Sequence, residues 1–202
     1  QFPLLRRLLD AMGVVQLELP SFEADDMLGT VSRLCEARGV RALLVTGDRD
    51  AMQLVSERTH VLYTKRGISD TVEFDPETVL ATFGVTPAQI PDLKGLMGDA
   101  SDNIPGVPGV GEKTAVKLLS QYGTVERALD AAPTDLKGKL RERMIDGRES
   151  ALMSKKIATI DREAPIELDW EACRVRDLSG GAPVLEEYEM KSLIPRLLAL
   201  AP

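Results

Sequence analysis

The chain has 202 residues, 44% of them hydrophobic and 28% charged, an ordinary composition for a globular protein long enough to bury a substantial core. No apolar run approaches the roughly 20 residues needed to cross a bilayer, so we expect no membrane-spanning segment. The net charge of −7 argues against a protein coated with positive charge for nucleic acid, but it is compatible with a local basic patch.

The first half of the chain predicts helices that alternate with strands. Apolar residues recur at helical spacing over Pro3–Met12, and Glu23–Arg38 predicts a helix with acidic residues in its first turn. Ala42–Thr46 is a short apolar run that suits a buried parallel strand. With this run, the predicted strands are Val14–Leu19, Ala42–Thr46, His60–Tyr63 and Thr71–Phe74. Their order predicts an α/β domain over residues 1–90, with a parallel sheet covered by helices.

From Pro76 onward the sequence predicts short helices separated by glycines, with little strand signal. The predicted helices are Pro76–Phe83, Pro87–Met97, Glu112–Tyr122, Val125–Ala131, Leu136–Ile145, Ser150–Ile160 and Val184–Leu198, the last kinked or restarted at Pro195. We therefore expect a helical domain over residues 91–202.

Three acidic clusters stand where this organisation places loops or helix starts. One opens the second predicted helix, one follows the strand that ends at Thr46, and one follows the helix that ends near Met97. Their members are Glu23, Asp25, Asp26, Asp48, Asp50, Asp99 and Asp102. Because open α/β sheets bind ligands beyond the carboxyl ends of their strands, we expect the first two clusters to meet there.

Carboxylates gathered in one place repel one another, so they either take up protons or hold cations. An all-oxygen set without nearby His or Cys fits Mg²⁺ or Mn²⁺. Two such ions about 4 Å apart can bind the attacking and leaving oxygens of an in-line phosphoryl displacement. Taken alone, the first cluster is better explained as a helix cap, and each of the other two is explained equally well as a turn, so the predicted metal site depends on all three occurring together.

A glycine-rich segment, Gly106–Ala115, joins a loop to the helix that runs toward Leu119. Glycines allow close backbone approach, the helix start offers N–H groups to a phosphate, and the turn carbonyls could hold a monovalent cation. The spacing differs from that of a nucleotide P-loop. We expect a helical hairpin that holds the phosphate backbone of a duplex. The candidate DNA-binding residues are Gly106, Gly109, Gly111, Lys113, Thr114 and Lys117.

With these motifs, nearly the whole chain resembles the 5′ nuclease domain of bacterial DNA polymerase I, within the flap endonuclease family. The similar stretches are Phe22–Asp26, Val45–Asp50, Leu96–Asn103, Ile104–Ala115 and Glu189–Leu193. The resemblance implies that the acidic residues above ligate two Mg²⁺ or Mn²⁺ ions. It also implies that Gly106–Ala115 is a helix–hairpin–helix element that holds duplex DNA with a K⁺ ion.

The fold implied by the resemblance is a PIN-like α/β core followed by a helical domain. The implied activity is that of a structure-selective 5′-3′ exonuclease or flap endonuclease, which removes 5′ flaps and RNA primers in replication and repair. The implied partner is duplex DNA with a 5′ flap or nick. We further expect a cytoplasmic monomer, with a polymerase as a possible continuation of the chain.

The chain departs from the family pattern at its start. The family's domain begins with a strand ending in Asp-Gly, a later strand ends in Phe-Asp, and a helical arch with Lys and Arg follows. Residues 1–202 contain none of these, and the first residue is Gln1. We therefore expect an incomplete nuclease core, and a non-catalytic fragment that binds duplex DNA stays as an alternative. A related RNase is a third hypothesis, which the duplex-binding hairpin disfavours.

Overall fold

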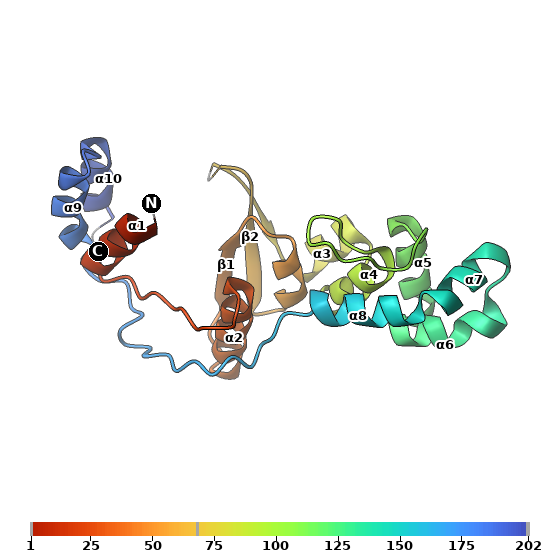
Figure 1. The fold of residues 1–202 in the computed structure, drawn as a ribbon. Helices are drawn as coiled ribbons and strands as arrows, with labels where there is room; N and C mark the ends of the chain where they lie inside the picture. Colours follow the sequence, from red (N-terminus) through yellow and green to blue (C-terminus); the bar gives the residue numbers. More distant parts are fainter. Residues whose placement is uncertain (1, 68, 201–202) are drawn as a thin grey trace. The chain divides into compact units, whose positions relative to one another are not determined.

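The computed structural model describes residues 2–67 and 69–200, which form two compact units (Figure 1). One unit combines the residues up to Phe22 with those from Pro165 onward, and the other runs from Glu23 to Ala164. Among the described residues, no helix has both the length and the apolar character that a membrane span requires.

The smaller unit consists of short helices from the two ends of the chain. Its elements are α1 (Phe2–Ala11), α9 (Ala182–Glu187), α10 (Ile194–Leu198) and the 3₁₀ helices η3 (Ser179–Gly181) and η4 (Lys191–Leu193). Arg7 on α1 donates hydrogen bonds of 2.7 and 2.6 Å to the Glu187 carboxylate on α9. The helix predicted over Val184–Leu198 is divided into α9, η4 and α10. Pro195 marks the restart, since it lies in the first turn of α10, where a missing N–H costs no helical hydrogen bond.

The segment Val14–Leu19 forms no strand, so that prediction was wrong. It follows α1 as irregular chain, and Val14, Val15 and Leu17 are 38%, 41% and 39% exposed. A strand is stable only when a neighbour satisfies its backbone groups. The sheet of the described residues is built from other segments.

The larger unit begins with a helix and a three-stranded mixed sheet. These elements are α2 (Ala24–Ala37), β1 (Ala42–Thr46), the 3₁₀ helix η1 (Asp50–Leu54), β2 (Thr59–Arg66) and β3 (Asp70–Phe74). β1 and β2 are parallel, with Leu44 opposite Val61, whereas β2 and β3 are antiparallel, with Val61 opposite Phe74. The predicted parallel sheet is therefore mixed, because the connection after Arg66 is too short for a crossover and joins β2 to an antiparallel neighbour.

The side chains of β1 alternate between the core and the surface. Leu44 is 5% exposed, whereas Leu43 and Val45 are 53% and 61% exposed. The strand predicted to be buried is therefore parallel to its neighbour and buried on one face. Among the described residues, only the face of β1 that carries Leu44 is covered.

Short helices make up the rest of the larger unit (Figure 1). They are α3 (Pro76–Phe83), η2 (Pro87–Gln89), α4 (Ile90–Met97), α5 (Glu112–Tyr122), α6 (Val125–Asp135), α7 (Gly138–Asp146) and α8 (Arg148–Ala158). One hydrophobic cluster runs from Leu44 in β1 to Ala151 in α8, so the sheet and these helices share a core. The division predicted at residue 90 falls at the start of α4 and stays a prediction.

A buried carboxylate ties α4 to two other helices. Asp92 Oδ1 accepts a hydrogen bond of 2.8 Å from the backbone N–H of Val125 and lies 2.8 Å from Lys155 Nζ on α8. Lys155 also contacts Glu126, with an N–O distance of 2.9 Å. Burial lowers the pKa of Lys155, but the two carboxylates outweigh it and hold that pKa above its usual value. Asp92 thus fixes α4 against α6 and α8.

We predict that Asp92→Ala lowers the free energy of unfolding by about 3 kcal/mol, because it leaves a buried N–H without its acceptor and an ammonium without one carboxylate. Denaturant unfolding measures the change. The matched control is Asp130→Ala, which removes a 66% exposed partner of Arg148 and should cost less than about 1 kcal/mol. Equal losses from the two substitutions would contradict this role for Asp92.

Candidate metal centre

Helix α4 carries a lysine into the middle of the acidic clusters. Lys94 is 8% exposed, and its ammonium group contacts the carboxylates of Asp50, Asp99 and Asp102. Lys94 Nζ lies 2.7 Å from Asp99 Oδ2 and 3.2 Å from Asp102 Oδ2. One oxygen from each of the three carboxylates lies within 4.8 Å of the others. The acids that follow β1 and those that follow α4 therefore meet at a single cation position.

The electrostatics of this group follow from burial and from the shared ammonium. Burial lowers the pKa of Lys94, but the surrounding carboxylates outweigh it and raise that pKa above its usual value. Hydrogen bonds from Lys94 and Ser101 lower the pKa of Asp99 to about 2. The pKa of Asp50 is raised, because burial and the charges of Asp48 and Asp102 outweigh the effect of Lys94. The site thus holds more negative charge than one ammonium neutralises.

Two further predicted ligands border this position. Burial and then the charges of Asp48 and Asp50 raise the pKa of Asp25, so this carboxyl at the start of α2 shares the field of the acids after β1. Asp48 is exposed, and its Oδ1 accepts a hydrogen bond of 2.8 Å from the backbone N–H of Asp50. This bond fixes the turn that leads into η1.

The other two acids of the first cluster lie differently. Glu23 is exposed at the N-cap of α2. Both carboxylate oxygens of Asp26 accept backbone hydrogen bonds of 2.9 Å, Oδ2 from Glu23 and Oδ1 from Asp161. The structure therefore gives Asp26 a role in fixing the backbone, and it brings together Asp50, Asp99 and Asp102 most closely.

The loop that carries Asp99 and Asp102 is closed by backbone contacts. Asp99 and Ile104 exchange two N–H···O hydrogen bonds of 2.8 Å. Gly98 and Gly106 pack backbone to backbone, and a Cβ on Gly106 would lie 2.2 Å from the Gly98 nitrogen. Gly106 also has a φ of +60°, which favours glycine. The hairpin thus starts directly against the end of α4, and the acidic loop is held between them.

The glycine hairpin leads into α5 with its two lysines outward. Gly109 has a φ of +79°, and its carbonyl accepts a hydrogen bond of 2.9 Å from Arg143 Nη1 on α7. Gly111, the N-cap of α5, has a φ of −95° and no atom within 4 Å of an added Cβ. The left-handed conformation is therefore needed at Gly109 and not at Gly111. Lys113 and Lys117 are exposed, one helical turn apart, and Thr114 is half-buried.

Sequence reasoning missed Lys94 and Arg143. Lys94 is the one charged residue between Asp92 and Asp99, in an otherwise apolar helical stretch, and this isolation was the available signal. Arg143 gave no such signal, because it is one of several charged residues along α7. Its contact with Gly109 depends on how α7 packs against the hairpin.

Asp50, Asp99 and Asp102 suit a divalent cation of the Mg²⁺ and Mn²⁺ class. They offer carboxylate oxygens around one position that already attracts a cation, the Lys94 ammonium. Hard cations such as Mg²⁺ and Mn²⁺ prefer oxygen ligands of this kind. A divalent ion at this position competes with Lys94 for the same carboxylates.

Comparison with known families covers most of the chain. Residues 1–84 match the family described as "5'-3' exonuclease, N-terminal resolvase-like domain", and residues 85–180 match "5'-3' exonuclease, C-terminal SAM fold". The chain belongs to the 5′-3′ exonuclease family. The predicted resemblance is confirmed.

One curated relative is DNA polymerase I of Bacillus caldotenax, which is 54% identical over 200 residues. The aligned residues cover 98% of this chain and 23% of the relative. DNA polymerase I of Mycobacterium bovis is 40% identical over 199 residues, covering 98% of this chain and 22% of the relative. The chain therefore spans about a fifth of the length of these relatives.

Solved structures with the same fold include a T5 5′-exonuclease with bound zinc ions, which matches with a TM-score of 0.65 and 19% sequence identity. The match covers 92% of this chain and 62% of the T5 chain. The catalytic core of Rad2 in complex with DNA substrate has a TM-score of 0.59 and 18% identity, covering 96% of this chain and 66% of that one. They confirm the predicted PIN-like 5′ nuclease core followed by a helical region, here with a mixed sheet.

We predict that Lys94→Met destabilises the metal-free protein by about 2 kcal/mol, because three carboxylates lose the cation between them. Millimolar Mg²⁺ or Mn²⁺ should reduce the difference in stability between the variant and the unsubstituted protein, since the ion binds the three carboxylates that have lost the ammonium. Melting temperatures with a chelator and with each ion measure both effects. Lys139→Met, on the exposed surface of α7, is the control and should change neither value. Unaltered stability of Lys94→Met in chelator would contradict the prediction.

Proposed function

We propose that this chain is the nuclease part of a structure-selective 5′-3′ exonuclease or flap endonuclease that hydrolyses DNA phosphodiesters. The observation that carries the proposal is the convergence of three carboxylates on one cation position. Asp50 comes from η1, and Asp99 and Asp102 come from the loop directly before the glycine hairpin. Membership of the 5′-3′ exonuclease family supports the class of reaction. The fold shared with the DNA-bound core of Rad2 supports DNA as the substrate.

The proposed cofactors are two Mg²⁺ or Mn²⁺ ions. Asp50, Asp99 and Asp102 would hold one ion. Asp25 and Asp48 would contribute to the second, since the charge of Asp48 helps to raise the pKa of Asp25. When bound, such ions neutralise charge on the phosphodiester and lower the pKa of water. A T5 5′-exonuclease structure with divalent zinc ions supports a divalent cation in this fold.

Lys94 has the role of preparing this site. Its ammonium keeps the carboxylates of Asp50, Asp99 and Asp102 close to one another and keeps Asp99 ionised. Without a cation, three such groups repel one another and move apart or take up protons. The ligand oxygens are therefore assembled before any ion or substrate arrives.

The proposed substrate is duplex DNA with a 5′ flap or a nick, held through its backbone by the hairpin. The proposed contacts are Gly109, Gly111, Lys113, Thr114 and Lys117. Gly106, the remaining predicted contact, is buried against Gly98, and we propose that it shapes the hairpin. The open space around Gly111 admits a phosphate, and the first turn of α5 presents backbone N–H groups next to Lys113. A K⁺ ion shared by the hairpin carbonyls and a phosphate is part of this proposal, and Arg143 competes with it for the Gly109 carbonyl.

The biological role that follows is the removal of 5′ flaps and RNA primers in DNA replication and repair. The relatives that match this chain are DNA polymerase I proteins. We therefore propose that the chain is part of a longer polypeptide that also carries a polymerase. We further propose that this polypeptide is a cytoplasmic monomer.

A single-turnover cleavage assay tests the reaction. The protein is mixed in excess with a 5′-flap duplex and Mg²⁺, and Asp50→Asn should lower the cleavage rate by more than about 100-fold, because the substitution removes a charged ligand oxygen. Duplex affinity should change little. A protein that binds the flap tightly and leaves it intact with either ion would favour the alternative of a non-catalytic binding fragment.

A binding assay tests the hairpin. Lys113→Ala should weaken duplex binding to a similar extent for unrelated sequences and reduce the salt slope of the binding constant by about one, because one phosphate contact is lost. Lys191→Ala, which removes a 71% exposed lysine from η4, should leave the slope unchanged. Loss of affinity for some base sequences only would contradict a backbone contact.

A further inference from the structure

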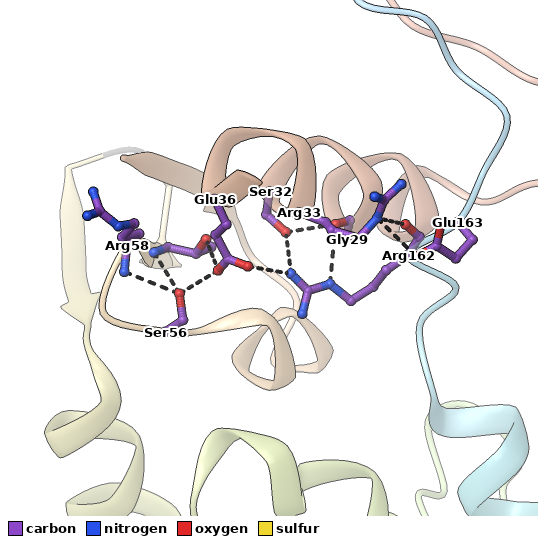
Figure 2. A network of polar contacts seen from close by, with 9 residues as sticks. Gly29, Ser32, Arg33, Glu36, Ser56, Arg58, Arg162 and Glu163 are labelled. Carbon is purple, nitrogen blue, oxygen red and sulfur yellow. Dashed lines mark hydrogen bonds and ion pairs between the residues drawn. The ribbon is translucent and has the colours of Figure 1, made fainter. Parts of the chain in front are cut away.

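A short segment after α8 lies across α2 and is held there by a network of polar contacts (Figure 2). We call this segment, Ile160–Ala164, the strap. Arg162 Nη2 donates a hydrogen bond of 3.0 Å to Glu36 Oε2, and the backbone carbonyl of Arg162 accepts one of 2.8 Å from Arg33 Nε. Arg33 Nε also lies 3.1 Å from Glu163 Oε1. Each segment thus contributes an arginine that binds the other, Arg162 from the strap and Arg33 from α2.

The packing beneath the strap shows that its path is specific. A Cβ on Gly29 in α2 would lie 2.8 Å from Ile160 Cγ2 and 3.2 Å from Arg162 Cγ, so a side chain there has no room. Glycine in the middle of a helix costs about 0.5–1 kcal/mol relative to alanine, and the close approach of the strap explains its presence. The backbone N–H of Ala164 donates to the buried Thr30 hydroxyl over 3.1 Å.

The strap also bonds directly to two segments that carry predicted metal ligands. The backbone N–H of Asp161 donates to Asp26 Oδ1 over 2.9 Å, one residue from Asp25. The backbone N–H of Ile160 donates to Gln53 Oε1 over 2.9 Å, and Gln53 lies in η1, whose first residue is Asp50. The strap therefore contacts both acid-bearing segments of the α/β part.

At its other end, the strap continues α8, which packs tightly on α4. A Cβ on Gly95 of α4 would lie 3.0 Å from Lys155 Cβ and 3.1 Å from the Ala151 carbonyl of α8. The neighbouring residue of α4 is Lys94. One continuous piece of chain, α8 and the strap, thus runs from the helix packed on α4 next to Lys94 to the segments that carry Asp25 and Asp50.

We propose that the strap is a positioning element for the metal centre. Arg162 holds the strap on α2 through Glu36, and Asp26 joins the strap to the start of α2, so that Asp25 faces the Asp50 group. Asp26 acts as a positioning residue, because its two oxygens join the backbone of the strap to the first turn of α2. The proposal rests on the proposed function, since it assigns a role within that same metal centre. Groups that orient ligands in this way commonly contribute about 10–100-fold to metal affinity.

The first test measures Mn²⁺ binding to the intact protein by calorimetry. Arg162→Gln should weaken binding by about tenfold. In a protein that also carries Asp25→Asn, the same substitution should change the remaining affinity by less than about twofold, because Arg162 acts through Asp25. Arg162→Lys, which keeps a charge beside Glu36, should weaken binding less and is informative even if the Gln variant folds poorly. Arg174→Gln, at an exposed ion pair with Glu171, is the control and should have no effect.

The second test needs no metal. Hydrogen exchange of the strap amides should become faster in Arg162→Gln and in Asp26→Asn. The first substitution removes the ion pair with Glu36, and the second leaves one acceptor oxygen for the two backbone N–H groups of Glu23 and Asp161. Exchange at the buried strand residue Val61 should stay unchanged in both. Asp25→Asn should leave strap exchange unaltered while weakening Mn²⁺ binding.

These results separate the strap from the metal centre itself. If Asp26→Asn abolishes Mn²⁺ binding and leaves strap exchange unchanged, Asp26 is a ligand and the positioning role is overturned. If Arg162→Gln and Asp25→Asn act additively on Mn²⁺ affinity, Arg162 does not act through Asp25, and the strap proposal fails while the proposed function stands. If the unsubstituted protein binds no Mn²⁺, both are overturned.

Discussion

The repulsion between carboxylates is the constraint on which this structure depends. Asp50, Asp99 and Asp102 come from two segments far apart in the sequence, and their oxygens lie within 4.8 Å of one another. In their ionised forms these groups stay together only with a cation between them, and Lys94 supplies one. The buried helix α4 therefore serves the core with its apolar side chains and the acidic site with its lysine.

The same helix explains why a metal centre and a hairpin occur next to each other. α4 ends at Gly98, the acidic loop follows, and Gly106 returns the chain against Gly98 to begin the hairpin. Asp92 fixes α4 to α6 and α8, and the strap connects α8 to α2. A duplex bound at Lys113 would thus contact the same connected set of helices that fixes the carboxylates of the proposed metal centre. This arrangement couples the proposed binding of DNA to the proposed place of cleavage.

Much of this organisation could be predicted from the sequence, because it depends on local patterns. The helices of the second half follow from apolar spacing and glycine stops, and the acidic motifs indicated the site through their order along the chain. The failures have non-local causes. Val14–Leu19 has strand composition but no pairing partner among the described strands, and the outer face of β1 is open at Leu43 and Val45. The contact of Lys94 with three acids depends on tertiary packing, which no sequence window contains.

Within the acidic motifs, sequence could not separate residues that face a cation from residues that fix the backbone. Asp25 and Asp26 are adjacent and chemically identical, yet one lies in the field of Asp48 and Asp50 and the other accepts two backbone N–H groups. The difference arises because neighbouring residues of a helix point in different directions, and because the strap that crosses α2 contacts Asp26.

The most direct test of this account is the position of bound Mn²⁺ in an anomalous difference map from crystals of the protein. We expect a peak about 2.0–2.6 Å from carboxylate oxygens of Asp50, Asp99 and Asp102, with the Lys94 ammonium displaced from the centre of the group. Lys94 still in contact with all three carboxylates at saturating Mn²⁺, with no peak beside them, would contradict the metal centre.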